Sequence, residues 1–493
     1  MKIQFSVIHP YRPLLIHHRS DCVLGRLRRR CQRKMTMTLR MVLVLAGLVL
    51  SASAANELPV VAKIFLPPRL QLGNTGILPV QPIDSAAWIW HPAFSEISAP
   101  AHAEVFPCGW HQPVLLRFRK QFEAAASPMR IHVSADERFE LFLDGQRIAR
   151  GPDRSDVEHW SYATYELRLA PGSHRLEALV WSIGPYAPVA QLSWRGGFIL
   201  KAEGDYDAQI TTGNAAWEVA KLEGCDFAPG VIFVGAELTA HDCGPQWKEG
   251  DYVKAQVIRG PIPNNIWGES VAGWKLCPTI LPDQLDREIT TGHAVALGNR
   301  ALGKDDVVKA EQAQHPDLPK WQALIDSKDQ VVVPANTEQF LLWDLGNYYC
   351  AYPLCEVSGG AGAKLTWSWA ESLYLPKSNS KGQRDEFVGK TFRGMTDTFL
   401  PGGAAHQKFS TLWWRAGRWC LLAIKTGNEP LTLHRIALDE SRYPYENAGA
   451  FDDGDSELPG VMALAVRGIQ MCSHETYMDC RPPSRTGAVP HAW

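Results

Sequence analysis

Short runs of alternating apolar and polar residues dominate this chain after about residue 88, and Gly and Pro turns separate them. Residues 139–144 alternate in this way, and Asp144-Gly145 then gives the dipeptide signal of a tight hairpin. Similar runs cover residues 176–180 and 364–369. Because no long helical period separates these runs, they predict antiparallel sandwiches or jelly rolls. We therefore expect a mainly β fold with two or more antiparallel β-sandwich domains.

One stretch near the C-terminus has the spacing of a helix. Pro459 is tolerated in the first turn of a helix, and Asp455 or Ser456 before it is a suitable N-cap. The apolar positions that recur at helical spacing are Leu458, Val461, Met462, Ala465, Ile469 and Cys472. The predicted helix leads into the polar stretch His474-Glu475-Thr476-Tyr477-Met478-Asp479-Cys480, where the side chains of a pocket can gather.

This polar stretch does not have the pattern of a metal site. His474 and Glu475 are neighbours in sequence, and the zinc motif H-E-x-x-H is not completed because position 478 is Met. The chain has 11 cysteines but no C-x-x-C pair. We therefore expect no metal and no cofactor.

Composition narrows the class of partner. A formal net charge of -2 and 45% hydrophobic residues are typical of a globular protein, so we expect no nucleic-acid partner. The length of 493 residues predicts about three domains. The 18 Trp residues fit either platforms for sugar rings or the filling of large β cores, and the sequence leaves both open. It also leaves the oligomeric state open.

The N-terminal 54 residues have the pattern of an export signal. Residues 41–50 are apolar throughout, and Ala52-Ser53-Ala54 follows as a small-residue cleavage site. Ten apolar residues are too few to span a bilayer, so we predict a signal peptide around residues 37–54 and a secreted or periplasmic protein without a membrane span. Residues 1–34 include an Arg-rich run, which is either an upstream extension or a basic arm for nucleic acid.

Composition shifts divide the rest of the chain. Residues 55–87 are rich in Pro and predict a linker, so that ordered structure begins at Trp88. We expect a first β-sandwich region over 88–335, a second β-sandwich over 336–445 and a different, helical unit over 446–493.

One pair of acids invites a catalytic interpretation. Asp385 and Glu386 are adjacent, and adjacent residues on a strand point to opposite faces. The two carboxylates therefore do not suit acid and base work on one glycosidic bond. We predict a solvated turn with local salt bridges.

Three stretches resemble one protein family. Residues 134–147, followed by Arg150-Gly151-Pro152, resemble the N-terminal β-sandwich of bacterial α-L-rhamnosidases. Residues 381–403 resemble the concanavalin-like sandwich that precedes the catalytic barrel in that family. Residues 455–480 are similar to the start of that barrel, an (α/α)6 arrangement of helical hairpins.

The resemblance implies an activity and a set of site residues. The family hydrolyses terminal α-L-rhamnosyl residues by an inverting mechanism, so rhamnose-containing glycans or glycosides are the implied partners. Asp479 matches the loop aspartate that holds sugar hydroxyls, and His474, Glu475 and Tyr477 are implied as substrate-binding residues. A second interpretation of His474 and Glu475 is that they fix the loop after the helix.

The sequence departs from the family pattern after Cys480. The family pattern places the general acid, a Glu, a few residues beyond Asp479 and the base much later, but residues 481–493 contain no Asp or Glu. We therefore expect a chain that is truncated at the start of the barrel and inactive as a hydrolase. Two alternatives are a carbohydrate-binding β-sandwich protein without catalysis and a non-functional fragment.

Overall fold

The computed structural model describes residues 60–66, 81–94, 113–125, 128–156, 159–187, 191–193, 195–228, 236–242, 248–259, 274–446, 448–449, 454 and 456–478. The chain divides into two compact units, Met1–Leu58 and Pro59–Trp493, and all described residues lie in the second. The predicted signal peptide and the Arg-rich extension lie outside the described residues. None of the helices in the described segments is long and apolar enough to cross a membrane.

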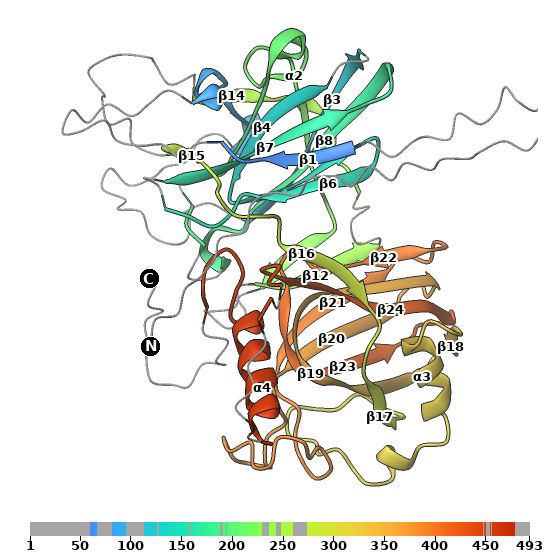
Figure 1. Ribbon diagram of the computed structural model, residues 1–493. Helices are drawn as coiled ribbons and strands as arrows, with labels where there is room; N and C mark the ends of the chain where they lie inside the picture. Colours follow the sequence, from blue (N-terminus) through green and yellow to red (C-terminus); the bar gives the residue numbers. More distant parts are fainter. Residues whose placement is uncertain are drawn as a thin grey trace, which may run out of the picture. The chain divides into compact units, whose positions relative to one another are not determined.

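Most regular elements of the described residues are strands (Figure 1), and nearly all neighbouring strands are antiparallel, which confirms the predicted mainly β class. The first sheet contains β1 (Val60–Ile64), β2 (Trp88–Trp90), β4 (Met129–Asp136), β7 (Trp160–Arg168), β9 (Gly197–Ala202), β14 (Gln256–Arg259) and β15 (Leu276–Pro278). The second contains β3 (Val114–Ala124), β5 (Arg138–Leu143), β6 (Gln146–Gly151), β8 (Gly172–Ser182), β10 (Glu218–Lys221) and β13 (Val253–Lys254). Buried residues from both sheets, among them Phe118 and Phe198, form one core.

The hairpin between β5 and β6 forms as the sequence predicts. Phe139 and Leu141 are fully buried, whereas Glu140 between them is half-buried. Asp144 and Gly145 both have positive φ angles, 50° and 82°, which is the conformation that a two-residue hairpin turn requires. One strand lies earlier in the chain than expected, because β1 falls inside the predicted linker and pairs with β7.

The third sheet is the largest. Its strands are β11 (Cys225–Ala228), β12 (Glu237–Asp242), β16 (Leu285–Ile289), β17 (His293–Gly298), β18 (Val331–Val333), β19 (Glu338–Gly359), β20 (Lys364–Ala370), β21 (Met395–Pro401), β22 (Gln407–Phe409), β23 (Arg415–Lys425) and β24 (Leu431–Arg442). Several of these precede residue 336, where the sequence placed the start of the second sandwich. Their pairing joins residues far apart in the chain, which local alternation does not reveal.

Tryptophan mainly fills cores in this protein. Trp181 of the second sheet shares a buried cluster with Trp343, Trp367 and Trp369 of the third sheet. Trp90, Trp217, Trp274, Trp321 and Trp419 are also almost fully buried. Of the two interpretations that composition left open, these residues therefore support the structural one.

Helical segments are few among the described residues. They are η2 (Pro82–Ser85), η3 (Pro92–Phe94), η4 (Gly184–Tyr186), η5 (Gly204–Tyr206), α2 (Asp207–Ile210), η7 (Gln312–Gln314), α3 (Leu318–Ile325) and α4 (Leu458–Met471). The sequence did not predict α3, which is short and buries Trp321, Leu324 and Ile325.

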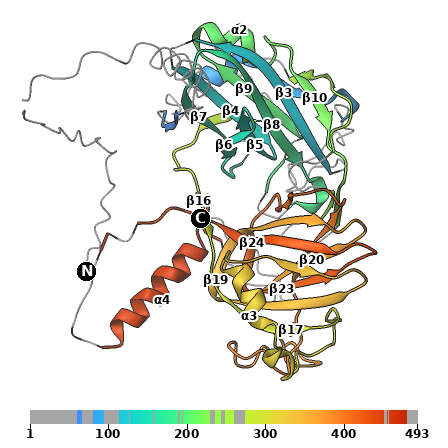
Figure 2. The same ribbon diagram turned by 90° about the vertical axis from the view of Figure 1, so that its right-hand side faces the viewer.

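Helix α4 covers the predicted stretch, with one correction at its start. The N-cap is Glu457, not Asp455 or Ser456, and its side chain makes no capping hydrogen bond. Figure 2 shows α4 beside β19. Met471 is the buried residue of the helix, whereas Leu464 is 75% exposed and Val461 57% exposed. The apolar side of α4 is therefore largely uncovered among the described residues.

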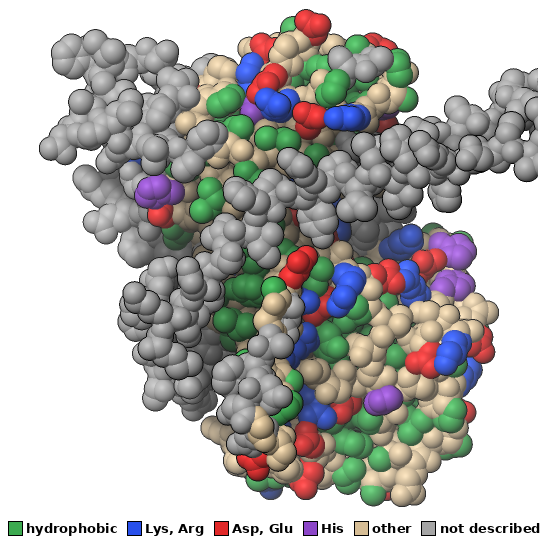
Figure 3. Space-filling model, viewed as in Figure 1, with side chains coloured by type: hydrophobic (Ala, Val, Ile, Leu, Met, Phe, Trp, Pro, Cys, Tyr) green, Lys and Arg blue, Asp and Glu red, His purple; other side chains and the backbone are tan. Residues whose placement is uncertain are grey.

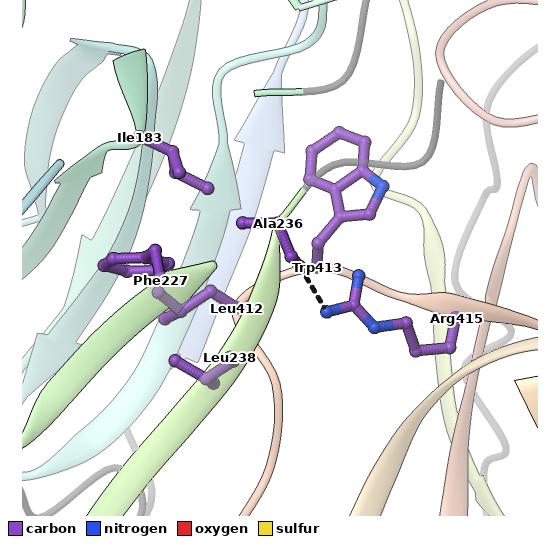
Figure 4. A pocket seen from close by; sticks show the side chains of 7 residues that line it. All are labelled: Ile183, Phe227, Ala236, Leu238, Leu412, Trp413 and Arg415. Carbon is purple, nitrogen blue, oxygen red and sulfur yellow. Dashed lines mark hydrogen bonds between the residues drawn. The ribbon is translucent and has the colours of Figure 1, made fainter. Parts of the chain in front are cut away.

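A buried ion pair holds β12 next to β21 in the third sheet. Arg415 donates two hydrogen bonds to Asp397, at 2.7 and 2.6 Å. It donates a third to the carbonyl oxygen of Ala236 at 2.8 Å, and Figure 4 shows this bond as a dashed line. Asp397 also accepts a hydrogen bond from the backbone N–H of Leu238 at 2.9 Å. The adjacent cavity is only about 10 Å³, which leaves room for a single water at most. This pair therefore fixes β12 parallel to β21.

Replacing Asp397 should strongly destabilise the protein. Asp397→Asn leaves Arg415 buried without its counter-charge, so we expect the free energy of unfolding to fall by about 3–5 kcal/mol. Asp385→Asn is the matched control, because Asp385 also pairs with an arginine, Arg418, but is 69% exposed, and it should change stability by less than about 1 kcal/mol. Urea unfolding measures both variants, and equal losses would contradict the structural role of Asp397.

Candidate functional site

The loop after α4 is closed by its own backbone. The N–H of Met478 donates to the carbonyl of Cys472 at 2.7 Å, and the N–H of His474 donates to Thr476 at 3.1 Å. The N–H of Tyr443, just after β24, donates to the carbonyl of Ser473 at 2.9 Å. The loop is therefore a compact turn attached to the end of β24.

Glu475 lies between two arginines, one in β5 and one in the segment after β6. Arg138 of β5 donates to its carboxylate at 2.8 Å, and Nε of Arg154 lies 3.5 Å from its other oxygen. Both guanidinium groups lie over the ring of Trp413, at 4.8 and 5.4 Å from the ring centroid. All three charged side chains are at most 7% exposed. A distant part of the chain therefore anchors the loop.

The electrostatics of this ion group fix the charge of Glu475. Burial acts to raise the pKa of Glu475, but the charges of Arg138 and Arg154 outweigh it and lower the pKa to about 2. Glu475 is therefore an ionised carboxylate at neutral and mildly acidic pH and holds no proton to donate. Its geometry favours the role of fixing the loop, and its predicted contact with substrate stays a prediction.

His474 is buried against an aromatic ring. Its imidazole stacks on Trp414, with the ring centroids 4.1 Å apart and the planes 8° from parallel. Burial lowers the pKa of His474 to about 4, an effect that Glu475 opposes and Arg154 assists. His474 is therefore a neutral, stacked ring above that pH.

Tyr477 is the exposed side chain among those predicted site residues that the structure describes. It is 65% exposed, and its hydroxyl accepts a hydrogen bond from the hydroxyl of Tyr445 at 3.1 Å. Tyr445 in turn lies against Tyr443, with ring centroids 4.6 Å apart. We call Tyr443, Tyr445 and Tyr477 the tyrosine group. Asp479 lies outside the described residues.

A cavity of about 250 Å³ adjoins the buried side of the loop. Its lining comes from several separate segments between β5 and the loop after α4. The lining residues are Arg138, Arg147, Ile148, Ala149, Arg150, Asp153, Asp283, Gln284, Asp286, Tyr352, Trp414, Ser441, His474 and Glu475. His474 and Glu475 therefore face a common space, whereas Tyr477 does not line it.

Carboxyl groups near this cavity have shifted pKa values. Burial, together with a hydrogen bond to Asp286, raises the pKa of Asp439 to about 7. Burial acts to raise the pKa of Asp286 as well, but the hydrogen bond with Asp439 and the charge of Arg150 lower it. The pair therefore shares one proton near neutral pH. Burial also raises the pKa of Asp153 to about 6.

Sequence reasoning missed most of the residues around this site. Arg138 and Arg150 lie in the stretch that resembles the rhamnosidase sandwich, but Glu475 is 337 positions after Arg138. The resemblance of that stretch could therefore have pointed to the arginines, but it could not have pointed to the residues that pair with them. Trp413 and Trp414 form an adjacent aromatic pair in the sequence and were not singled out.

Two other expectations can be compared with the structure. Asp385 lies at an exposed turn and forms an ion pair with Arg418, and Glu386 beside it is exposed, which confirms the predicted solvated turn. Within the described segments, no group of three or more His, Cys, Asp or Glu side chains is arranged to hold a metal ion.

Acidic and basic side chains are interspersed over the surface in view. Figure 3 shows Lys and Arg next to Asp and Glu on that face, without a large area of one sign.

Comparison with known proteins identifies the class of fold. No family model matches this sequence, and no curated protein matches it. Among solved structures, a GH78 family rhamnosidase of Bacillus sp. GL1 is similar with a TM-score of 0.54 and 15% identity, over 80% of this chain and 59% of that chain. This likeness shows that the fold resembles the β-sandwich region of rhamnosidases.

Two further α-L-rhamnosidases are similar at lower scores. The enzyme from Dictyoglumus thermophilum has a TM-score of 0.49 with 14% identity, and that from Aspergillus terreus has 0.47 with 13%. In each case 80% of this chain is matched to 40% of the other. The chain therefore spans between two fifths and three fifths of the length of these structures.

The buried His474 should make stability fall in acid. Its unfolded-state pKa is about 6.5, whereas its folded-state pKa is about 4, so below pH 6.5 the unfolded state takes up a proton that the folded state does not. The stability contributed above pH 6.5 is lost as the pH falls towards 4. Between pH 7 and 5 this loss is on the order of 2 kcal/mol.

The variant His474→Phe isolates this effect, because phenylalanine keeps an aromatic ring next to Trp414 and does not titrate. We expect the wild type to lose more unfolding free energy between pH 7 and 5 than the variant, by about that amount. Urea unfolding at the two pH values measures the difference. Parallel pH profiles would show that His474 is not buried in its neutral form.

Proposed function

We propose that this chain is an α-L-rhamnosidase-type glycoside hydrolase polypeptide and that its ligands are rhamnose-containing glycans or glycosides. The observation that carries the proposal is the fold likeness to the Bacillus rhamnosidase over 80% of this chain. The resemblance of residues 134–152 and 455–480 to the same family supports it from the sequence. A signal peptide around residues 37–54 is consistent with action on glycans outside the cytoplasm.

The described residues of the loop after α4 do not supply the protonated acid of inverting hydrolysis. That reaction needs a protonated acid and a carboxylate base about 6.5–9.5 Å apart. Glu475 is unsuited to the acid role because Arg138 and Arg154 keep it ionised. We therefore propose that this chain binds its glycan without hydrolysing it, with Asp479 holding sugar hydroxyls as the family resemblance implies.

The tyrosine group is the proposed contact surface for the sugar. Tyr477 presents an exposed aromatic face, and the hydrogen bond to Tyr445 holds its hydroxyl in place. Aromatic rings of this kind offer an apolar face to the C–H groups of a sugar and a polar edge to its hydroxyls. This exposed surface also favours the second candidate, a carbohydrate-binding protein without any catalytic role.

A combined assay tests hydrolysis and glycan binding separately. We expect no release of 4-nitrophenol from 4-nitrophenyl α-L-rhamnoside and measurable binding of an α-L-rhamnosyl oligosaccharide by calorimetry. Tyr477→Ala should weaken binding about threefold to tenfold, because stacking of one ring contributes about 0.5–1.5 kcal/mol. Phe65→Ala is the matched control, since Phe65 is a 55% exposed ring outside the tyrosine group, and it should leave binding unchanged.

Asp479→Asn tests the residue assigned by resemblance. It should weaken binding of the same oligosaccharide, because an amide is a poorer acceptor for sugar hydroxyls than a carboxylate. Turnover that survives this substitution would contradict both the role of Asp479 and the proposed lack of hydrolysis. If the wild type hydrolyses the rhamnoside and Asp479→Asn abolishes this turnover, the family assignment is supported and the proposed lack of hydrolysis is wrong. Absence of any glycan binding would contradict the proposed function altogether.

A further inference from the structure

The cavity beside the α4 loop has the chemistry of a binding site in its own right. We propose that it binds a neutral polyhydroxylated molecule of about one sugar ring, at a site separate from the tyrosine group. This inference goes beyond the proposed function, because Tyr477 does not line the cavity.

Charge balance disfavours an anionic ligand. Each arginine that lines the cavity already has an acidic partner: Arg138 pairs with Glu475, Arg147 with Asp286, and Arg150 with Glu140 at 2.8 Å and Asp286 at 3.2 Å. Among the described lining residues, no guanidinium is therefore left over to pair with a carboxylate or phosphate ligand. A neutral ligand leaves these ion pairs intact.

Gln284 shows what kind of neutral ligand the cavity suits. The oxygen and the nitrogen of its side-chain amide are both shielded from solvent, and neither has a hydrogen-bond partner among the described residues. A buried polar group without a partner costs about 1–3 kcal/mol. Hydroxyl groups both donate and accept, so a polyhydroxylated ligand can satisfy both ends of this amide.

Size and aromatic surface point to one ring. The cavity of about 250 Å³ is larger than a cavity of roughly 150 Å³ that encloses benzene and smaller than the roughly 300–1,000 Å³ of sites for drug-sized ligands. Tyr352 and Trp414 line it together with the polar groups. Aromatic carbon beside hydrogen-bonding groups matches the mixed surface of a sugar ring.

The position of the cavity makes binding measurable through stability. Its lining comes from β5 and β6 of the second sheet, from the segment entering β16, from β19 and β24, and from the α4 loop. A ligand that contacts these separate segments binds only the folded chain. Binding should therefore raise the unfolding temperature.

Calorimetry and thermal unfolding of the full chain with L-rhamnose, D-glucose and D-glucuronate test the proposal. We expect the two neutral sugars to bind and raise the unfolding temperature, and D-glucuronate to bind at least tenfold more weakly. Gln284→Met should weaken neutral-sugar binding about threefold to tenfold, because it removes one or two hydrogen bonds. Its ligand-free unfolding temperature should not fall, since the amide has no partner to lose.

The control variant is Gln314→Met, an exposed glutamine in η7 away from the lining, which should bind like the wild type. Equal effects of the two Gln substitutions, tighter binding of D-glucuronate, or no binding of either neutral sugar would each overturn the inference. Loss of monosaccharide binding in Tyr477→Ala but not in Gln284→Met would overturn it and leave the proposed function intact. If Gln284→Met loses monosaccharide binding and the wild type binds no α-L-rhamnosyl oligosaccharide, the cavity site is supported and the proposed function is refuted.

Discussion

The ion group of Arg138, Glu475 and Arg154 over Trp413 is the contact on which the site depends. It joins β5 to the loop after α4, 337 positions later in the chain. With the loop fixed there, His474 stacks on Trp414 and both loop residues face the same cavity. Loss of Glu475 would leave two buried guanidinium groups without their shared counter-charge, so the carboxylate holds the group together.

Buried charge of this kind gives specificity more readily than it gives stability. The desolvation of three ionised side chains offsets much of their mutual attraction. The gain is a defined geometry and defined protonation states, an ionised Glu475 and a neutral His474. These states argue against acid catalysis by Glu475 and for a rigid wall on which polar ligands can be placed.

Local patterns predicted local structure well. The β5–β6 hairpin and the extent of α4 follow from alternation, turn dipeptides and helical spacing within short windows. The short helix α3 was missed because eight residues give too little periodicity to recognise. The membership of the third sheet was also missed, since β16 to β18 pair with strands more than 40 residues later in the chain.

The stretch from Asp136 to Arg138 shows how sequence and tertiary structure divide the information. Asp136 accepts a hydrogen bond from Trp274, Glu137 accepts from the backbone N–H groups of Ile183 and Gly184, and Arg138 binds Glu475. The sequence by itself determined the β class, the hairpin, the terminal helix and the family resemblance, because these depend on neighbouring residues. Only the tertiary structure decided the partners of these side chains, the cavity and the protonation states, because they depend on contacts between segments hundreds of residues apart and on burial.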